Sequence, residues 1–461
     1  MTDETLTPQH TSQEGLYGIT PELVSDVKQA LEDNNRQTLA ALIEDLHAAD
    51  VAELIGRLSP EDRKVFVEII KDKLEPEVYT ELEDQLKEEI LDLVGTGSLA
   101  AAISELDSDD AIYVIEDMDQ ESQREVLKAI PAQERAILEE VLTYPEDSAG
   151  RLMQREIVVA PTFWTVAETI AFIRESSDLP DIFYNIFVVD PKHHPIGVIP
   201  LNEILKRDPE TQISEIMDGE IKTIPVAMDQ EEVAGLFQRY ALVSAPVVDD
   251  SGRIVGMVTV DDVVDVIEEE AEEDIMHLSG VGESDFHAPV AKTAYWRSRW
   301  LFVTLINTLI AASVIAQFES SIKEKVALSF LMVIVAAMGG NAGMQTVTVT
   351  VRALATNELR KGIFGKSIIK EVLVSCVIGC AFAVFLGFVA YFWLHEVGVG
   401  IVLGVALIAN MIWAGFAGTA LPVLVQRMGM DPAISAGPLL STTTDVLGYA
   451  IFLGIATYFL L

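Results

Sequence analysis

Five long apolar stretches fill the last third of the chain, and they constrain its fold more than any other feature. They run approximately over 300–317, 326–355, 368–394, 399–425 and 434–461. Each is close to or longer than the ~20 residues that an α-helix needs to cross a ~30 Å hydrocarbon core. The sequence therefore predicts a helical membrane domain with five spans.

Basic residues are shared unequally between the two sides of these spans. One side carries Arg297, Arg299, Arg352, Arg360, Lys361, Lys366, Lys370 and Arg427. The other side carries only Lys323 and Lys325, with a glutamate between them. Because cytosolic loops are enriched in Lys and Arg, we expect a cytosolic N-terminal half and an outside C-terminus, in the cell (inner) membrane. The acidic, polar N-terminus predicts no signal peptide.

The part before the spans is strongly acidic. Residues 1–290 hold 20 Lys and Arg against 65 Asp and Glu, a net charge of −45. Residues 291–461 hold 11 against 7, a net charge of +4. An acidic surface repels nucleic acid and concentrates cations. We therefore expect a cationic ligand and no nucleic-acid partner, with adaptation to high salt as the alternative explanation.

Polar residues interrupt two of the predicted spans. The run Gly339–Thr346, which includes Asn341, is small and polar, and Asp445 lies near the middle of the last span. An Asp at mid-membrane costs roughly 2.5–3.5 kcal/mol on insertion scales, and we expect no Lys or Arg inside the spans to pair with it. Asp445 therefore indicates an ion pathway, with a paired buried acid as the alternative. For the glycine-rich run, helix packing is the alternative.

The prolines and cysteines of the spans allow two further interpretations. Pro422 and Pro438 predict broken helices, which are tolerated at membrane depth where they line a water-filled path. Cys376 and Cys380 have no His or carboxylate at ligand spacing, so we interpret them as structural.

A lone carboxylate in a pore suits a divalent cation that keeps its water. Mg²⁺ binds oxygen and is usually held through its hydration shell by one or two carboxylates. In a symmetric dimer Asp445 would become a pair on the axis. Since five spans are few to enclose a pore, we expect a homodimer in the lipid bilayer.

An internal repeat organises the first part of the cytosolic half. The segment Leu39–Leu46 is echoed by Leu99–Leu106, and apolar residues recur at three and four. This periodicity is helical, and strand signals are sparse before Tyr144. The sequence predicts stacked helical hairpins over 20–142.

A second repeat follows. Met153–Ile157 pairs with Met217–Ile221, and each copy is predicted as strand, helix, strand, turn, strand, helix. Residues 149–207 and 213–267 resemble a tandem pair of cystathionine-β-synthase (CBS) domains. The resemblance implies adenine nucleotide (ATP) binding through Gly256, Thr259 and Asp262. The first copy departs from that pattern, with Pro200 and Glu203. Helix capping by Thr259 and Asp262 is the alternative.

An acidic run, Asp261–Asp274, lies directly before the membrane half. Asp261, Asp265 and Glu268 or Glu269 fall on one helical face, where like charges destabilise an isolated helix. A solvated linker helix is the alternative to a cation-sensing helix. The position between the repeats and the spans favours sensing.

Together these features resemble the MgtE family over nearly the whole chain. The most specific segments are Gly339–Thr346 with Val351–Ala355, Gly429–Ala433 and Thr444–Gly448. The resemblance implies a multidomain fold: an all-α superhelical N domain, an α/β CBS pair and an α-helical transmembrane bundle of five spans per subunit. The implied parts are a flexible N-terminus (1–19), the N domain (20–142), the CBS pair (143–267), an acidic connecting (plug) helix (268–294) and the channel domain (295–461).

The resemblance also implies roles for individual residues. It implies a homodimeric channel that imports Mg²⁺, with Asp445 at the selectivity position, Asp431 near the cytosolic mouth and Asn341 in the pore. Cytosolic Mg²⁺ closes such a channel. The acids implied for gating are Asp109, Asp229, Glu231, Asp261, Asp262, Asp265, Glu270 and Glu273. Three residues depart from the family pattern: Tyr113 and Ala241 replace acids, and Gly437 replaces an Asn.

Two other functions fit parts of the sequence. A transporter or exchanger of another divalent cation, such as Mn²⁺ or Co²⁺, would use the same pore residues. A membrane-anchored nucleotide sensor would leave Asp445 unexplained. The sequence contains no HExxH, nucleophile elbow or phosphate loop, so an enzyme is not expected.

Overall fold

The computed structural model describes residues 18–461 except 34, 45, 72, 117, 177, 178, 181, 279–289, 356–358 and 360–363. The chain forms two compact units, Met1–Ile267 and Glu268–Leu461. Each unit is described by itself. Of the N-terminal segment expected to be flexible, 1–17 lies outside the described residues.

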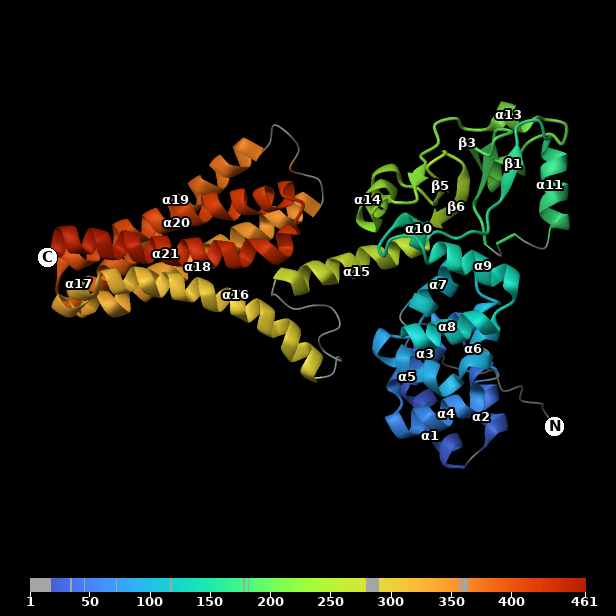
Figure 1. Cartoon of the computed structure of the whole chain (residues 1–461), viewed down its shortest axis with the longest axis horizontal. Helices are drawn as coiled ribbons and strands as arrows, with labels where there is room; N and C mark the ends of the chain where they lie inside the picture. The colour runs from blue at the N-terminus through green and yellow to red at the C-terminus, as the bar shows by residue number, and fades with distance from the viewer. Residues whose placement is uncertain are drawn as a thin grey trace, which may run out of the picture. The chain divides into compact units, whose positions relative to one another are not determined.

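Helices alone build the first part of the first unit (Figure 1). They are α1 (Pro21–Glu32), α2 (Arg36–Ile43), α3 (Ala48–Arg57), α4 (Pro60–Ile70), α5 (Asp84–Val94), α6 (Thr96–Ile103), α7 (Ser108–Glu116), α8 (Gln120–Ala129) and α9 (Ala132–Val141), with a 3₁₀-helix, η2 (Pro76–Tyr79). Thr20 and Ser59 cap α1 and α4 by accepting backbone N–H bonds, and each is followed by a proline in the first turn. Proline suits that position because its missing N–H would be unpaired there anyway.

The predicted helical repeat is present. The echoed segments form α2 and α6, which have the same length and bury equivalent residues: Leu39 with Ile43, and Leu99 with Ile103. In both copies a turn leads to the next helix, α3 or α7. Helix α7 therefore follows the second copy of the repeat, as α3 follows the first.

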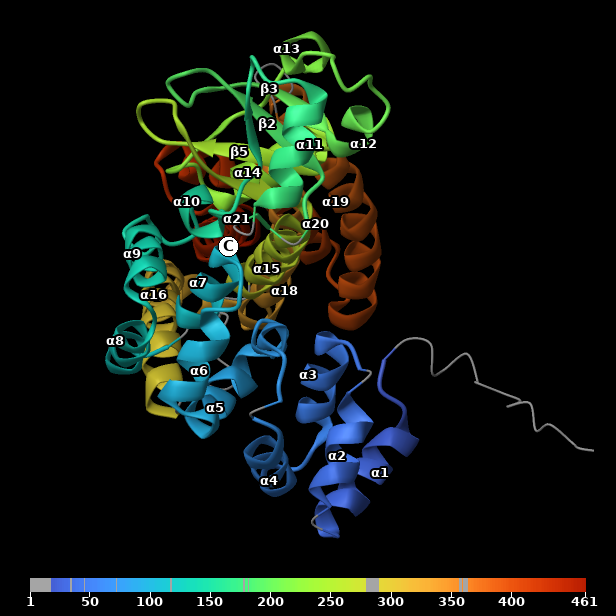
Figure 2. The same cartoon turned by 90° about the vertical axis from the view of Figure 1, so that its right-hand side faces the viewer.

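Two three-stranded sheets form the rest of the first unit. The first sheet contains β1 (Val159–Pro161), β2 (Asn185–Val189) and β3 (Pro195–Pro200), and helices α11 (Val166–Glu175), α12 (Leu201–Ile204) and α13 (Ile213–Ile216) pack with it. The second contains β4 (Ile224–Pro225), β5 (Ser244–Val248) and β6 (Ile254–Thr259), and α10 (Ala149–Leu152), α14 (Gln230–Tyr240) and the start of α15 (Val260–Leu278) pack with it. In both, the first pair of strands is parallel and the second antiparallel. Helix α11 lies beside its sheet in both views (Figures 1 and 2). The predicted α/β repeat is confirmed.

The second unit holds the membrane helices. They are α16 (Val290–Gln317), α18 (Ala327–Ala355), α19 (Phe364–Leu394), α20 (Val397–Arg427) and α21 (Pro432–Leu460), with a short helix, α17 (Glu319–Glu324), between the first two. Within the described residues these are five helices long and apolar enough to cross a membrane, as predicted. Helices α18, α20 and α21 pack on one another, and α19 packs on α20 (Figure 1).

The expected helix breaks are not found. The run Gly339–Thr346 lies inside the continuous helix α18, and Pro422 and Pro438 lie inside α20 and α21. The carbonyl of Pro438 accepts bonds from Asn307 Nδ2 (3.3 Å) and Thr442 Oγ1 (2.7 Å). A proline removes the hydrogen bond to the carbonyl four residues before it, and membrane helices tolerate this loss where neighbouring helices pack against them, so the chain need not break.

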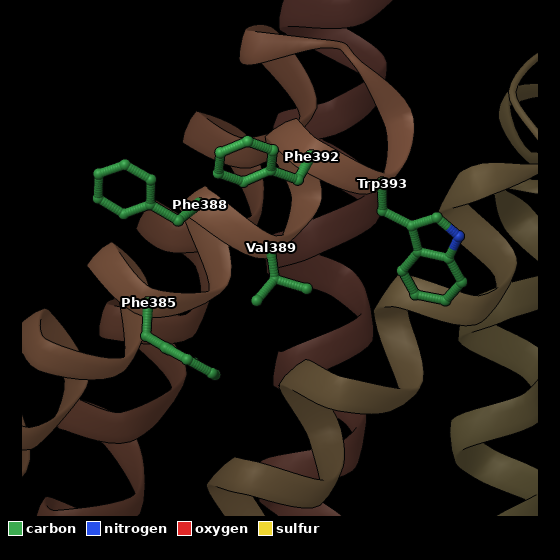
Figure 3. A pocket seen from close by; sticks show the side chains of 5 residues that line it. All are labelled: Phe385, Phe388, Val389, Phe392 and Trp393. Atoms are coloured by element: carbon green, nitrogen blue, oxygen red, sulfur yellow. The ribbon is translucent and has the colours of Figure 1, made fainter.

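The outer surface of α19 is aromatic. Figure 3 shows Phe385, Phe388, Val389, Phe392 and Trp393 around a shallow hollow of about 430 Å³. These side chains are apolar and mostly exposed, which suits a helix that faces lipid. This hollow is not a candidate ion site, because no charged or hydroxyl group lines it.

Candidate functional site

The first turns of α7 and α15 bring acidic residues together in the first unit. Asp109 and Asp110 begin α7, and Asp261 and Asp262 begin α15. Burial raises the pKa of Asp109 well above its usual value, and the charges of Asp262 and Asp110 raise it further. Burial, then Asp107, Glu77 and Asp261, raise the pKa of Asp110 to about 6. We call Asp109, Asp110, Asp261 and Asp262 the acidic face.

Asp262 is held in place by Thr259. The Thr259 hydroxyl donates to Asp262 Oδ2 at 2.6 Å, and the Thr259 backbone also bonds this carboxylate. Burial nevertheless raises the pKa of Asp262 to about 7, helped by the charges of Asp261 and Asp110. The carboxylate therefore points into a region where negative charge is already concentrated. A divalent cation is the ligand that such a region would favour.

A set of hydrogen bonds holds α7 against the start of the CBS pair. The backbone N–H and hydroxyl of Ser108 donate to Glu156 Oε2 at 3.2 and 2.8 Å. The Ser108 hydroxyl oxygen accepts from the Arg155 N–H at 2.7 Å, and Gln154 Nε2 donates to Asp107 at 2.6 Å. These bonds fix the end of α7 that carries Asp109. They oppose the repulsion within the acidic face.

Other acids implied for gating lie elsewhere. Asp229 caps α14 by accepting the Glu231 N–H at 2.9 Å, and its charge raises the pKa of Asp147, whose largest cause of shift is burial. Asp265 is exposed, one turn after Asp261 on α15. Thus the structure brings together four acids of the first unit, of which the sequence named three; Asp110 was missed. Its signal was its place beside Asp109 in the first turn of a predicted helix.

The three residues named for nucleotide binding have structural partners. A side-chain Cβ at Gly256 would lie 2.6 Å from the Gln154 carbonyl oxygen, so β6 passes too close to the first CBS copy for any other residue. Thr259 and Asp262 bond each other at the start of α15, which is the capping role considered as the alternative. Their nucleotide role stays a prediction.

Two departures from the family pattern have local explanations. The Tyr113 ring covers the Lys87 ammonium group, 3.6 Å from the ring centroid, and Lys87 is fully buried. Ala241 ends α14 in the left-handed region, with φ of 50°. Tyr113 therefore contacts a buried cation where the family has an acid, and Ala241 forms the end of a helix where the family has an acid.

Asp445 lines a cavity of about 350 Å³ in the membrane unit. Its other lining residues come from α16, α18 and α21: Arg297, Trp300, Leu301, Thr304, Asn307, Thr308, Met344, Ile434, Gly437, Pro438, Ser441 and Thr442. Six waters at about 30 Å³ each occupy roughly 180 Å³, so a fully hydrated small cation fits this volume. The participation of α16 was missed, because only its apolar content was used to place it.

The hydroxyl groups of this cavity act as donors within their own helices. Thr304 and Thr308 donate to the carbonyls of Trp300 and Thr304 at 3.2 and 2.9 Å. Ser441 and Thr442 donate to the carbonyls of Gly437 and Pro438 at 3.0 and 2.7 Å. A hydroxyl that donates backward to its helix keeps lone pairs for other donors. The wall thus offers oxygen acceptors to the outward-pointing protons of a hydrated cation.

The expectation that no basic residue lies within the spans is wrong. Helix α16 begins at Val290, and the part long and apolar enough to span begins at Thr293, so it includes Arg297 and Arg299. The ends of three other spanning helices contain Arg352, Lys366, Lys370 and Arg427. Arg297 lines the cavity with Asp445. Within the described residues, however, Asp445 forms no ion pair. Asn341 lies exposed on α18 and is not among the residues lining this cavity.

Asp431 joins the start of α21 to the end of α15 in the second unit. Its Oδ1 accepts the Ala433 N–H at 2.7 Å, and its Oδ2 lies 3.1 Å from His277 Nδ1. The same His277 nitrogen lies 3.3 Å from Glu273 Oε1. Two acids that the sequence assigned separately, to the pore mouth and to gating, therefore meet at one histidine. His277 itself was missed.

In the described part of the chain, no three His, Cys, Asp or Glu side chains converge closely enough to bind a metal ion directly. A bare transition metal would need such a set. Mg²⁺ is different, because it retains several waters and is bound by one or two carboxylates. The two acidic sites suit that second mode of binding.

Comparison with known proteins places this arrangement in a family. Three family models match: the MgtE divalent cation transporter domain at 332–455, the MgtE intracellular N domain at 46–147, and the CBS domain at 149–210 and 213–269. The magnesium transporter MgtE of Bacillus subtilis (strain 168) is 30% identical, over 95% of this chain and 98% of its own. The chain belongs to the MgtE family.

Further relatives agree. The magnesium transporter MgtE of Thermus thermophilus is 33% identical, over 94% of this chain and 98% of its own. A solved structure described as the cytosolic domain of the Mg²⁺ channel MgtE in complex with ATP is 32% identical to this MgtE-family chain. It covers 53% of this chain and 99% of its own, with a TM-score of 0.50. The predicted multidomain fold is thereby confirmed.

Proposed function

We propose that this chain is a magnesium channel that imports Mg²⁺ across the cell membrane as a homodimer. The observation that carries the proposal is Asp445 in a cavity that is lined partly by hydroxyl groups and whose volume exceeds that of a hydrated ion. Relatives over nearly the whole chain are named magnesium transporters. In a symmetric pair, two Asp445 carboxylates would face one path and attract a divalent cation more strongly than a monovalent one.

The topology supports import under cytosolic control. Arg427 stacks on Phe364 with 5.9 Å to the ring centroid, so the ends of α20 and α19 that carry basic residues lie together. Lys325 pairs with Glu396 at the loops on the other side. With the basic side cytosolic, the N-terminal half is cytosolic and the C-terminus outside.

Gating follows from the repulsion within the acidic face. At low cytosolic Mg²⁺ the fraction of Asp109, Asp110 and Asp262 that is ionised repels itself, which favours separation of α7 from α15. Bound Mg²⁺ cancels that repulsion and favours their contact. A shift from mostly open to mostly closed needs about 5.5 kcal/mol of differential binding, which several weak sites can supply together. The remaining gating acids proposed are Asp229, Glu231, Asp265, Glu270 and Glu273.

The cytosolic mouth gives this signal a route to the pore. Glu273 lies near the end of the acidic helix α15, and Asp431 caps α21, the helix that carries Asp445. Mg²⁺ shared between these two carboxylates would hold α15 at the start of α21. That contact would close the path.

The CBS pair is proposed to bind adenine nucleotide as a second ligand. The support is that the similar solved cytosolic domain is described in complex with ATP. Thr259 and Asp262 would then both cap α15 and contact the nucleotide. Equilibrium binding of ATP to the full chain, with Thr259→Val as the variant, tests this: unchanged affinity would exclude Thr259 from the site.

The decisive experiment is Mg²⁺ uptake into reconstituted vesicles by the wild type, Asp445→Asn and Asp265→Ala. Asp445→Asn should lose most uptake, because it neutralises the one carboxylate among the described residues that line the cavity. Asp265→Ala should still conduct at internal Mg²⁺ that closes the wild type. Gly454→Ala is a matched control on the same helix, since a Cβ there meets no atom within 4 Å.

Two outcomes would contradict the proposal. Wild-type uptake by Asp445→Asn would remove Asp445 from the path. Faster transport of Mn²⁺ or Co²⁺ than of Mg²⁺, dependent on an imposed proton or sodium gradient, would instead indicate an exchanger of another divalent cation.

A further inference from the structure

A single carboxamide is fully buried where three membrane helices meet. Asn410 on α20 has no exposed surface, and its Nδ2 donates to the Val335 carbonyl on α18 at 2.9 Å. In a regular helix that carbonyl also accepts the N–H of the residue four positions later, which is Gly339. The bond therefore reaches through the surface of α18 to its backbone.

Two glycines make room for this side chain. A Cβ at Gly339 would lie 2.1 Å from Asn410 Nδ2, and a Cβ at Gly448 on α21 would lie 2.8 Å from it. Real Cβ atoms do not approach so closely, so α18 and α21 each contact the carboxamide with bare backbone. Asn410 is thus enclosed between the two helices. Their separation at this level is set by its thickness.

The role of Asn410 as a spacer between helices does not explain why this residue is polar. Asn410 Oδ1 is buried and has no hydrogen-bond partner among the described residues. Leaving such a group unpaired is destabilising, and a leucine of similar size would avoid that cost. What an apolar residue cannot supply is the directional bond to Val335. That bond fixes both the height and the rotation of α18 against α20.

The junction lies one turn from the candidate ion site. Asp445 precedes Gly448 by three residues on α21. Thr444 is fully buried, and its hydroxyl oxygen would be 4.0 Å from a Cβ at Gly340, next to Gly339. Because a helix is stiff over one turn, the contact of Gly448 with Asn410 determines where the Asp445 carboxylate stands.

We infer that Asn410 is a positioning residue of the ion pathway: enclosed by Gly339 and Gly448 and bonded to Val335, it holds α18 and α21 at the spacing that places Asp445 in its cavity. The inference rests on the proposed function of Asp445. According to this inference, Asn410 influences the affinity for the ion although it does not line the cavity.

The test is the concentration dependence of Mg²⁺ uptake by the full chain in vesicles, for Asn410→Ala and Asn410→Ser. A displaced Asp445 should raise the half-saturating Mg²⁺ concentration by about fivefold or more, which corresponds to roughly 1 kcal/mol. A variant that merely folds less well lowers the maximal rate and leaves half-saturation unchanged. The two variants are measured together so that one is informative if the other does not assemble.

Thr419→Ala is the matched control. Thr419 is equally buried on α20, but its hydroxyl donates to Gly415 of the same helix at 3.0 Å. Its removal should lower stability without moving half-saturation. A second arm uses Gly339→Ala, which collides with Asn410 in the wild type but fits when residue 410 is Ala, so its effect should largely disappear in the Asn410→Ala background.

The outcomes separate the two ideas. Unchanged half-saturation in both Asn410 variants, or additive effects of Gly339→Ala and Asn410→Ala, overturns the positioning role and leaves Asp445 in place. If Asp445→Asn itself keeps wild-type half-saturation and rate, the proposed pathway fails first, and the inference falls with it.

Discussion

At the scale of single residues, the acidic face shows how local bonds and collective charge compete. Thr259 bonds to the ionised form of Asp262 and lowers its pKa, whereas burial and two neighbouring carboxylates raise it more. Asp110, in the facing helix, is shifted in the same direction. The folded protein therefore binds protons at these acids more tightly than the unfolded chain does. A metal ion would take the place of those protons.

This shift predicts a pH dependence of stability. The folded pKa values of about 6 for Asp110 and about 7 for Asp262 lie above their usual value near 4. The stabilisation is therefore complete below about pH 4 and is lost as the pH rises from about 4 to about 7. Without Mg²⁺, the packing of α7 on α15 should weaken over this range. Hydrogen exchange of α7 in the full chain, corrected for the intrinsic pH dependence of exchange, measures it.

The isosteric change Asp262→Asn isolates one group. It keeps the acceptor for Thr259 but removes the charge, so at pH 8 it should stabilise this packing by about 1 kcal/mol, a partial effect because the side chain is not wholly buried. The pH dependence should become shallower. Asp119→Asn, at an exposed helix cap outside the acidic face, is the control. A steeper profile for Asp262→Asn would contradict the assignment.

At the scale of helices, close contact of small residues holds the membrane unit together. Gly418 on α20 faces α18 so closely that a Cβ would lie 2.8 Å from the Gly343 carbonyl oxygen. Lipid tails are as apolar as leucine, so helices in a bilayer associate through such packing and not through a hydrophobic effect. Gly339, Gly343, Gly415, Gly418 and Gly448 are therefore contact residues, whereas Gly454 is not. Their number reflects how tightly α18, α20 and α21 pack.

A pair of alanine substitutions tests this reading. Gly418→Ala should lower stability by about 1–3 kcal/mol, because backbone atoms of α18 must move. Gly454→Ala on α21 meets nothing within 4 Å and should be neutral or stabilising by up to about 1 kcal/mol. Thermal unfolding of the purified full chain in one detergent compares them. Equal effects of the two substitutions would show that packing at Gly418 is loose.

At the scale of the whole molecule, the negative charge lies almost entirely in the part before the membrane helices. Residues 1–290 carry −45 and residues 291–461 carry +4. The acidic part can be stable in water only while its charges are screened or neutralised, since self-repulsion opposes a compact state. Cations in the surrounding solution therefore contribute to its stability.

Screening and binding can be separated experimentally. Raising NaCl from about 50 to about 300 mM shortens the Debye length and should protect α7 from hydrogen exchange in the absence of Mg²⁺. A few mM Mg²⁺ should protect it more than NaCl of the same ionic strength, because bridging ions act at the acidic face itself. Equal protection at equal ionic strength would indicate screening alone and remove the proposed sensor sites.

The sequence by itself determined the classes of structure. Burial must repeat with the period of a helix or strand, so the helical repeat, the two α/β copies and the five apolar helices could all be read from residue order. It also indicated Asp445, because a carboxylate in an apolar span is costly wherever the helix goes. It could not reveal contacts between residues far apart in the chain.

Those contacts were decided by the tertiary structure. Three of these contacts join segments that are far apart in the sequence, where residue order does not indicate which segments are close in space. They are Asp110 near Asp261, His277 between Glu273 and Asp431, and α16 beside Asp445. The continuation of α20 and α21 through Pro422 and Pro438 is of the same kind, because α18, α20 and α21 pack on one another and hold the chain helical. The spacing of apolar residues within one helix or strand is a local property of the sequence, whereas the distance between two side chains depends on how whole helices pack.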